Sequence, residues 1–282
     1  MTHPSTAAPA ALESFLHAIP KVELHCHLFG SVRHRTFAAL NRQAGSPLAD
    51  DEIEGFYTRG EKPVGVLRVL RALDSQLVRS ADDLHRLTLE YLEDAAAHNV
   101  RYSEFFWNPT GTVQVSGIPY RLAQDAVVRA IHDASSQFGI TGRLIAAIDR
   151  EASPEAAVEM VQWVAQNRSD EVIGIGIDYR EVDRPPELFA QAYADARRAG
   201  LKTTAHAGEF GMPWTNVRTA LELLQVDRID HGYTVVDEPA FARQCAERGV
   251  IFTVVPTNSY YLRTLPPERW ALDHPIRRMP GL

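Results

Sequence analysis

The chain has 282 residues, of which 45% are hydrophobic, and a formal net charge of −7 with a pI near 5.9. A chain of this length and hydrophobic content can bury the core of one large domain, and its negative charge argues against a nucleic-acid partner. Two cysteines, Cys26 and Cys245, form no C-x-x-C pair, so neither a disulfide framework nor a thiolate zinc site is expected. No apolar run could cross a bilayer, and Met1–Ala11 lacks the regions of a signal peptide. We therefore expect a cytoplasmic protein with no membrane partner.

Seven short runs are predicted to be strands of a parallel sheet. Most are almost continuously apolar, as expected of strands covered on both faces. The predicted strands are Val22–His25, Tyr102–Phe106, Leu144–Ile148, Ile173–Ile177, Lys202–His206, Arg228–Asp230 and Val250–Val255. Amphipathic stretches between them predict helices, several with proline near the start or glycine just past the end. The clearest are Asp82–His98, Pro119–Phe138, Pro154–Gln166, Pro186–Ala199, Thr215–Leu224 and Pro239–Arg248.

Strands and helices alternate without a linker, which indicates a single α/β domain over residues 1–282. No G-x-G-x-x-G or Walker motif follows a strand, which disfavours a nucleotide-phosphate fold. We predict a (β/α)8 TIM-type barrel, whose active site collects residues from the C-terminal ends of its strands. Ala271–Arg278 has the pattern of a last short helix before a strand that this sequence does not contain. We therefore expect a C-terminally incomplete barrel with the eighth strand missing.

An inserted segment, Asp50–Arg79, lies between the first two predicted strands. It contains one helix with an apolar face, made of Val66, Leu67, Leu70, Leu73 and Leu77. The sequence allows two positions for this helix, a roof over the pocket or the outside of the barrel.

Histidines stand at the ends of three predicted strands. Side chains alternate along a strand, so His25 and His27 point to the same face and can bind one cation together. His206 ends the fifth strand, and His231 follows the sixth. Catalytic zinc commonly has three protein ligands and a water, whose pKa the metal lowers toward neutrality. We therefore predict a metal site made by His25, His27 and His206.

Two further residues are candidates for proton transfer. Glu209 lies three residues after His206, where a carboxyl near the metal can protonate a ring nitrogen of a substrate. The alternative is an acid favoured by the N-terminus of the next helix. His231 can accept a proton from the metal-bound water, although a lone histidine is more often a packing residue.

Three segments together resemble the adenosine/adenine deaminase family of metal-dependent hydrolases. They are Pro20–Leu28 (PKVELHCHL), Thr204–Glu209 (TAHAGE) and Arg228–Tyr233 (RIDHGY), in the family order and spread over nearly the whole chain. The resemblance implies one zinc ion held by His25, His27 and His206, with Glu209 protonating a purine ring and His231 acting on the zinc-bound water. The implied reaction is hydrolytic deamination of adenine, adenosine or a modified adenosine, with release of ammonia.

The sequence departs from this family at three places. The fourth zinc ligand of the family, an aspartate after strand eight, and the catalytic aspartate beside it have no counterpart before Leu282. Phe29 stands where many adenosine deaminases have an acid that contacts the ribose 5′-hydroxyl, so we expect a free base or a substrate that is apolar there. The segment Ile177–Glu181 lacks the glycine that adenosine deaminases use near the base. Phe29 and Asp178 are predicted to bind the substrate.

Two other interpretations stay open. One is a truncated family member with a partial metal site and impaired catalysis. The other is an amidohydrolase that acts on a cyclic amide, although the fourth strand ends in Asp178 and not in the lysine that many binuclear relatives carboxylate. The cytidine-deaminase signature, with H-x-E and P-C-x-x-C, is absent. The sequence leaves open the purine, the native metal and the oligomeric state.

Overall fold

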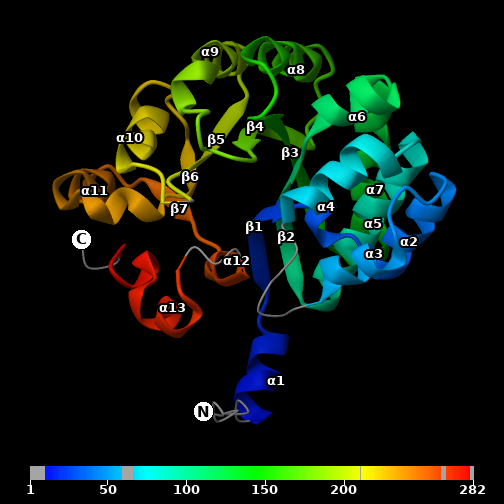
Figure 1. The fold of residues 1–282 in the computed structure, drawn as a ribbon, viewed down its shortest axis with the longest axis horizontal. Coiled ribbons are helices and arrows are strands. Elements are labelled where there is room, and N and C mark those ends of the chain that lie inside the picture. The colour runs from blue at the N-terminus through cyan, green and yellow to red at the C-terminus, as the bar shows by residue number, and fades with distance from the viewer. Residues whose placement is uncertain (1–9, 59–65, 210, 262–264, 280–282) are drawn as a thin grey trace.

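The fold is organised around a parallel sheet that curves into a nearly closed barrel (Figure 1). The structure, a computed structural model, describes residues 10–58, 66–209, 211–261 and 265–279, so the predicted stretches Met1–Ala11 and Asp50–Arg79 lie partly outside it. Its strands follow one another in chain order. They are β1 (Lys21–His27), β2 (Val100–Trp107), β3 (Thr141–Asp149), β4 (Val172–Asp178), β5 (Lys202–Ala207), β6 (Arg228–His231) and β7 (Ile251–Thr253).

All seven predicted strands are present, and the (β/α)8 TIM-type fold is confirmed. The described residues contain no eighth strand, and no strand pairing joins β7 to β1. A side chain connects these two edges instead, since His25 Nδ1 of β1 donates to the carbonyl of Thr253 of β7 at 3.0 Å. Arg228 of β6 also reaches β1 and donates to the carbonyl of Leu24 at 2.9 Å. The last strand is shorter than predicted because β7 pairs with β6 only through Ile251–Thr253.

Helices surround the sheet (Figure 1). They are α1 (Ala10–Ala18), α2 (His34–Gln43), α3 (Asp50–Tyr57), α4 (Val66–Ala72), α5 (Ala81–Ala97), α6 (Pro109–Ser116), α7 (Tyr120–Phe138), α8 (Pro154–Gln166), α9 (Ala190–Arg198), α10 (Trp214–Glu222), α11 (Pro239–Glu247), α12 (Pro256–Tyr261) and α13 (Pro267–Asp273). The six predicted helices are all present. The one predicted at Pro186–Ala199 begins with a 3-10 turn, η3 (Pro186–Phe189), before α9. Other short helical turns are η1 (Leu28–Ser31), η4 (Tyr233–Asp237) and η5 (Pro275–Arg277).

The inserted helix is attached to the C-terminal ends of β3 and β4, the end of the barrel at which the roof alternative places it. It is α4 continued by a π-helical turn, η2 (Leu73–Leu77). Arg71 from α4 donates two hydrogen bonds to Asp149, the last residue of β3, at 2.5 and 2.8 Å. Its guanidinium also lies 3.9 Å from the ring centre of Tyr179, which directly follows β4. Part of the predicted apolar face, the side chain of Val66, lies outside the described residues.

The core has two parts. A large cluster fills the space between the sheet and the helices, and a small one inside the barrel joins Phe106, Ile145 and Ala147. The small cluster lies against the histidines, because the Phe106 ring stacks on His27 with ring centres 5.0 Å apart. The histidines at the strand ends therefore pack against apolar side chains inside the barrel.

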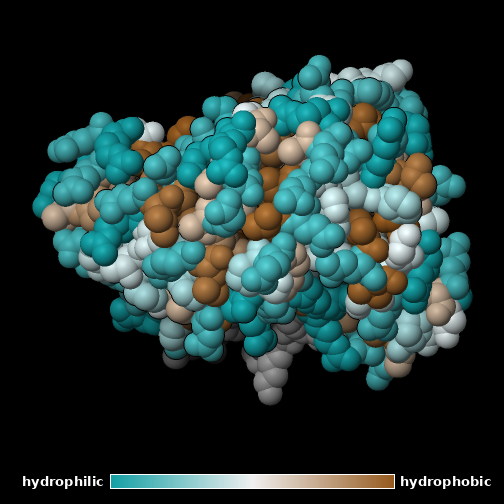
Figure 2. Space-filling model, turned by 90° about the horizontal axis from the view of Figure 1, so that it is seen from above, coloured by the Kyte–Doolittle hydropathy of each residue, from teal (hydrophilic) through white to brown (hydrophobic). Residues whose placement is uncertain are grey.

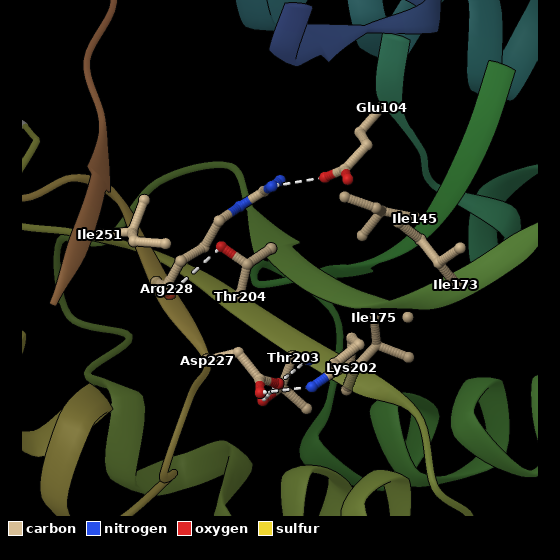
Figure 3. Close-up of a pocket in the computed structure, with 11 residues that line it drawn as sticks. Glu104, Ile145, Ile173, Ile175, Lys202, Thr203, Thr204, Asp227, Arg228 and Ile251 are labelled. Carbon is tan, nitrogen blue, oxygen red and sulfur yellow. Dashed lines mark hydrogen bonds and ion pairs between the residues drawn. The ribbon is translucent and has the colours of Figure 1, made fainter. Parts of the chain in front are cut away.

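The opposite, N-terminal end of the barrel carries a separate cavity of about 260 Å³ (Figure 3). Lys202, Arg228 and Ile251, which line it, are the first residues of β5, β6 and β7. This cavity is thus distinct from the predicted site. The face of the molecule in Figure 2 is mostly hydrophilic, with hydrophobic residues in small groups. Within the described ranges, no helix combines the length and apolar character needed to cross a membrane.

The pairing of β4 with β5 depends on a residue without a side chain. A Cβ added to Gly174 would lie 2.3 Å from the carbonyl oxygen of Lys202, which is backbone and cannot rotate away. We predict that Gly174→Ala lowers the free energy of unfolding by about 1–3 kcal/mol, as overpacking does. Chemical denaturation would measure this. Gly30→Ala is the control, since its added Cβ would meet nothing closer than 3.8 Å, and equal stability of both variants would contradict the prediction.

Candidate functional site

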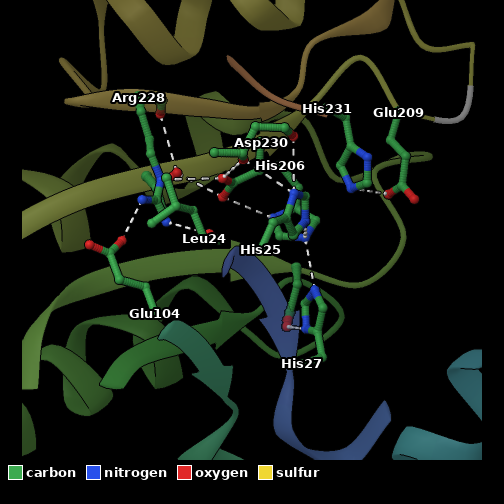
Figure 4. Close-up of polar contacts among 12 residues, drawn as sticks. Leu24, His25, His27, Glu104, His206, Glu209, Arg228, Asp230 and His231 are labelled. Atoms are coloured by element: carbon green, nitrogen blue, oxygen red, sulfur yellow. Dashed lines mark hydrogen bonds and ion pairs between the residues drawn. The ribbon is translucent and has the colours of Figure 1, made fainter. Parts of the chain in front are cut away.

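Four histidines meet at the C-terminal ends of β1, β5 and β6 (Figure 4). Nε2 of His206 lies 3.1 Å from Nε2 of His25 and 3.1 Å from Nε2 of His27. His231 is close to the same point, with its ring centre 4.6 Å from that of His25 and 4.8 Å from that of His206. The three predicted ligands therefore come together, and His231 joins them.

The outer nitrogens of the three predicted ligands each face an acceptor. Nδ1 of His25 is bonded to the carbonyl of Thr253 at 3.0 Å, and a carbonyl can only accept, so this nitrogen carries the hydrogen. Nδ1 of His27 lies 3.1 Å from an oxygen of Asp178, and Nδ1 of His206 lies 3.4 Å from one of Asp230. An acceptor beside Nδ1 favours the hydrogen on that nitrogen and the lone pair on Nε2, so the lone pair of His206 lies opposite those of His25 and His27.

Burial keeps the imidazoles of His25, His206 and His231 neutral. Burial lowers the pKa of His25 to about 3, an effect that Asp230 opposes and the neighbouring imidazoles strengthen. Burial also lowers the pKa of His206, and it lowers that of His231 well below the usual range. Metal ions bind the neutral form of histidine, so a proton is not a strong competitor for these nitrogens near neutral pH.

Glu209 and His231 face each other beside this cluster, with Oε2 of the carboxyl 3.4 Å from Nε2 of the ring. Burial raises the pKa of Glu209 to about 8, and the carboxylate of Glu181 adds to this effect. His231 has a φ of +68°, an uncommon conformation for a residue other than glycine. The alternative that Glu209 is a helix N-terminal acid is wrong, because α10 begins only at Trp214.

The two predicted substrate-binding residues differ in their surroundings. Phe29 lies in η1, two residues after His27, and is 4% exposed. Both oxygens of Asp178 already have partners in the protein, His27 at 3.1 Å and the amide of Asn108 at 2.6 Å. Asp178 therefore holds His27 from behind in this structure, and a direct contact between Asp178 and substrate remains a prediction.

Sequence reasoning missed several residues of the site. Asp230 is fully buried, faces His206, and accepts hydrogen bonds from Thr204 at 2.7 Å and Thr253 at 2.5 Å. A signal for it was present, because an acid inside an apolar strand next to His231 needs a partner. Arg150 and Glu181, which hold the backbone around His206 and Glu209, gave no such signal.

Known proteins resemble this chain in both sequence and structure. The family model described as "Adenosine deaminase" matches residues 20–280. The chain belongs to the adenosine deaminase family. This confirms the resemblance and makes the chain a hydrolase of the deaminase class that acts on C–N bonds, as predicted.

Individual members of the family cover most of the chain. The adenine deaminase of Vibrio parahaemolyticus is 34% identical over 254 residues, which are 89% of this chain and 74% of that protein. The crystal structure of adenine deaminase from Arthrobacter aurescens has a TM-score of 0.82 at 30% identity, covering 94% of this chain and 79% of that one. A cog1816 amidohydrolase from Burkholderia ambifaria, crystallised with bound Zn, has a TM-score of 0.95 at 65% identity over 99% of this chain and 76% of its own.

Proposed function

We propose that the protein is a zinc-dependent hydrolytic deaminase of an aminopurine, that it releases ammonia, and that adenine suits it better than adenosine. One observation carries the proposal. The Nε2 atom of His206 lies 3.1 Å from the Nε2 atoms of both His25 and His27, and lone pairs this close repel one another unless a cation lies between them. Zinc–nitrogen bonds of about 2.0–2.1 Å in tetrahedral geometry separate two ligand nitrogens by about 3.3 Å, so the spacing suits one zinc ion per chain.

His25, His27 and His206 would hold this ion, and bound zinc supplies a water that is a nucleophile near neutral pH. The ring nitrogens of His25, His206 and His231 all lie within 4.8 Å of one another, so on distance alone His231 competes with His27 as the third ligand. We assign His231 to proton transfer because its Nε2 faces Glu209 instead. The zinc in the related Burkholderia ambifaria structure supports the choice of metal.

Glu209 is suited to donate a proton to the purine ring. Its pKa is raised to about 8 by burial, so the carboxyl holds its proton at neutral pH. A carboxyl in this state can protonate a ring nitrogen as the amino-bearing carbon is attacked, and the ring then retains that proton while ammonia leaves. His231, neutral and 3.4 Å from Glu209, is placed to accept one proton of the attacking water and to pass it to the amino group, which leaves as ammonia. The second proton of the water would then restore the Glu209 carboxyl.

The choice of adenine depends on Phe29. This buried phenyl group lies two residues after the end of β1, where an acid would be needed to accept a hydrogen bond from a ribose hydroxyl. A ribose placed against it would lose water from a hydroxyl without gaining a partner, at a cost of about 1–3 kcal/mol. The relatives named adenine deaminases, at 34% and 30% identity, support the same choice.

We predict that His206→Ala removes zinc from the protein. His206 supplies the nitrogen that is 3.1 Å from both other ligands, so its loss leaves the ion with two imidazoles. Elemental analysis after dialysis would measure zinc per chain. The control is His132→Ala, whose imidazole pairs with Glu171 at the surface. Equal zinc content in both variants and the native protein would show that the site is assigned wrongly.

We predict that Glu209→Gln keeps zinc but lowers kcat by about 10²–10⁴-fold. Glutamine preserves the shape of the side chain and cannot donate the carboxyl proton. Ammonia release from adenine would give kcat, and elemental analysis would give the zinc content. Glu222→Gln, at an exposed position on α10, is the matched control and should behave as the native protein. A Glu209→Gln variant with near-normal kcat would remove this residue from the mechanism.

We predict that the native protein has a higher kcat/KM for adenine than for adenosine, and that Phe29→Asp reduces this ratio. The new carboxylate can accept a hydrogen bond from the ribose. Steady-state kinetics with both substrates would test this, with Phe29→Leu as the apolar control that should retain the preference. If adenosine is the better substrate of the native protein, the role given to Phe29 is wrong.

A further inference from the structure

The backbone that carries Glu209 is held by a carboxylate from another strand. Glu181, in the loop after β4, is 2% exposed. Its two oxygens lie 3.1 and 2.9 Å from the amide nitrogen of Gly208, and one of them lies 3.4 Å from that of Glu209. The side-chain amide of Asn216 donates to the same carboxylate at 2.8 Å. One side chain thus receives the N–H groups of both peptides that flank Gly208.

The position of Glu181 depends in turn on a buried arginine. Arg150, in the loop after β3, is fully buried, and its Nη1 lies 3.7 Å from Glu181 Oε1. Its Nη2 donates to the carbonyl of His206 at 2.5 Å. Arg150 is itself held by Arg184, whose Nε donates to the Arg150 carbonyl at 2.8 Å. The Arg150–Glu181 pair therefore contacts both ends of the turn from His206 to Glu209.

The conformation of this turn explains the need for a restraint. Gly208 has a φ of +68°, and a Cβ there would lie 2.4 Å from Oγ1 of Thr234. Successive N–H groups around a left-handed residue form a concave site that favours an anion. In a buried loop these N–H groups need an acceptor, and Glu181 provides it.

We propose that Glu181 is a positioning residue for the deamination: it fixes the Gly208–Glu209 backbone so that the Glu209 carboxyl stays opposite His231. Glu181 is not a catalytic residue, because its oxygens are occupied by protein donors. The kinetic part of this inference rests on the proposed function. The restraint of the backbone can be measured without turnover.

The test compares Glu181→Ala with Glu181→Gln. Alanine removes the acceptor, whereas glutamine keeps one oxygen that can still accept from Gly208. For Glu181→Ala we expect faster hydrogen exchange in peptides covering residues 206–209, unchanged zinc content, and a kcat for adenine lowered by about 10–100-fold with little change in KM, as for misplacement of a catalytic group. Glu181→Gln should restore part of both the exchange protection and kcat.

Asp227→Ala is the matched control. Asp227 accepts the backbone N–H of Thr203 at 2.8 Å, at the opposite end of the same strand, β5. This variant should lose protection only near residues 202–204 and keep kcat.

Unchanged exchange at residues 206–209 in Glu181→Ala overturns the proposal. So does a loss of zinc, or a fall in kcat that equals the unfolded fraction measured by thermal denaturation. If Glu181→Ala does not fold, Glu181→Gln decides: fully native exchange at residues 206–209 together with native kcat in this variant would overturn the proposal. A native protein that releases no ammonia from any aminopurine would refute the proposed function, and the exchange measurement would still decide whether Glu181 restrains the turn.

Discussion

The convergence of three imidazole lone pairs is the constraint on which the site depends. His25 and His27 share a face because a strand alternates its side chains, and His206 reaches them across the barrel at 3.1 Å. This arrangement is stable only if each ring is fixed from behind. The carbonyl of Thr253 and the carboxylates of Asp178 and Asp230 provide this support. Residues of three other strands, β4, β6 and β7, therefore determine the orientation of the three ligands.

The same need for buried acceptors extends to the proton-transfer groups. Glu209 projects from a turn whose N–H groups are bound by Glu181, and Glu181 contacts Arg150, which is bonded to the carbonyl of His206. Metal ligand and proton donor are thus held by one polar network at the strand ends. The hydrogen bonds of Glu181 to the Gly208 amide and of Arg150 to the His206 carbonyl restrict the turn, because a buried donor or acceptor is costly to leave without its partner.

The inserted helix α4 adds a different kind of restraint. Arg71 connects it to Asp149 at the end of β3 and to the ring of Tyr179 after β4. The helix is therefore attached to the rim of the barrel by a guanidinium and not only by apolar packing. This attachment holds the helix against the C-terminal ends of β3 and β4.

The sequence by itself determined the order of strands and helices, because apolar runs and amphipathic stretches depend on local periodicity. It also predicted the meeting of His25, His27 and His206, since parallel strands of a barrel bring their C-terminal ends to one side. Only the tertiary structure decided which side chains stand behind these ligands. Asp230, Glu181 and Arg150 act through contacts between segments far apart in the chain, such as Arg150 with His206. Spacing in the sequence carries no record of such contacts, because they depend on how loops of different strands pack.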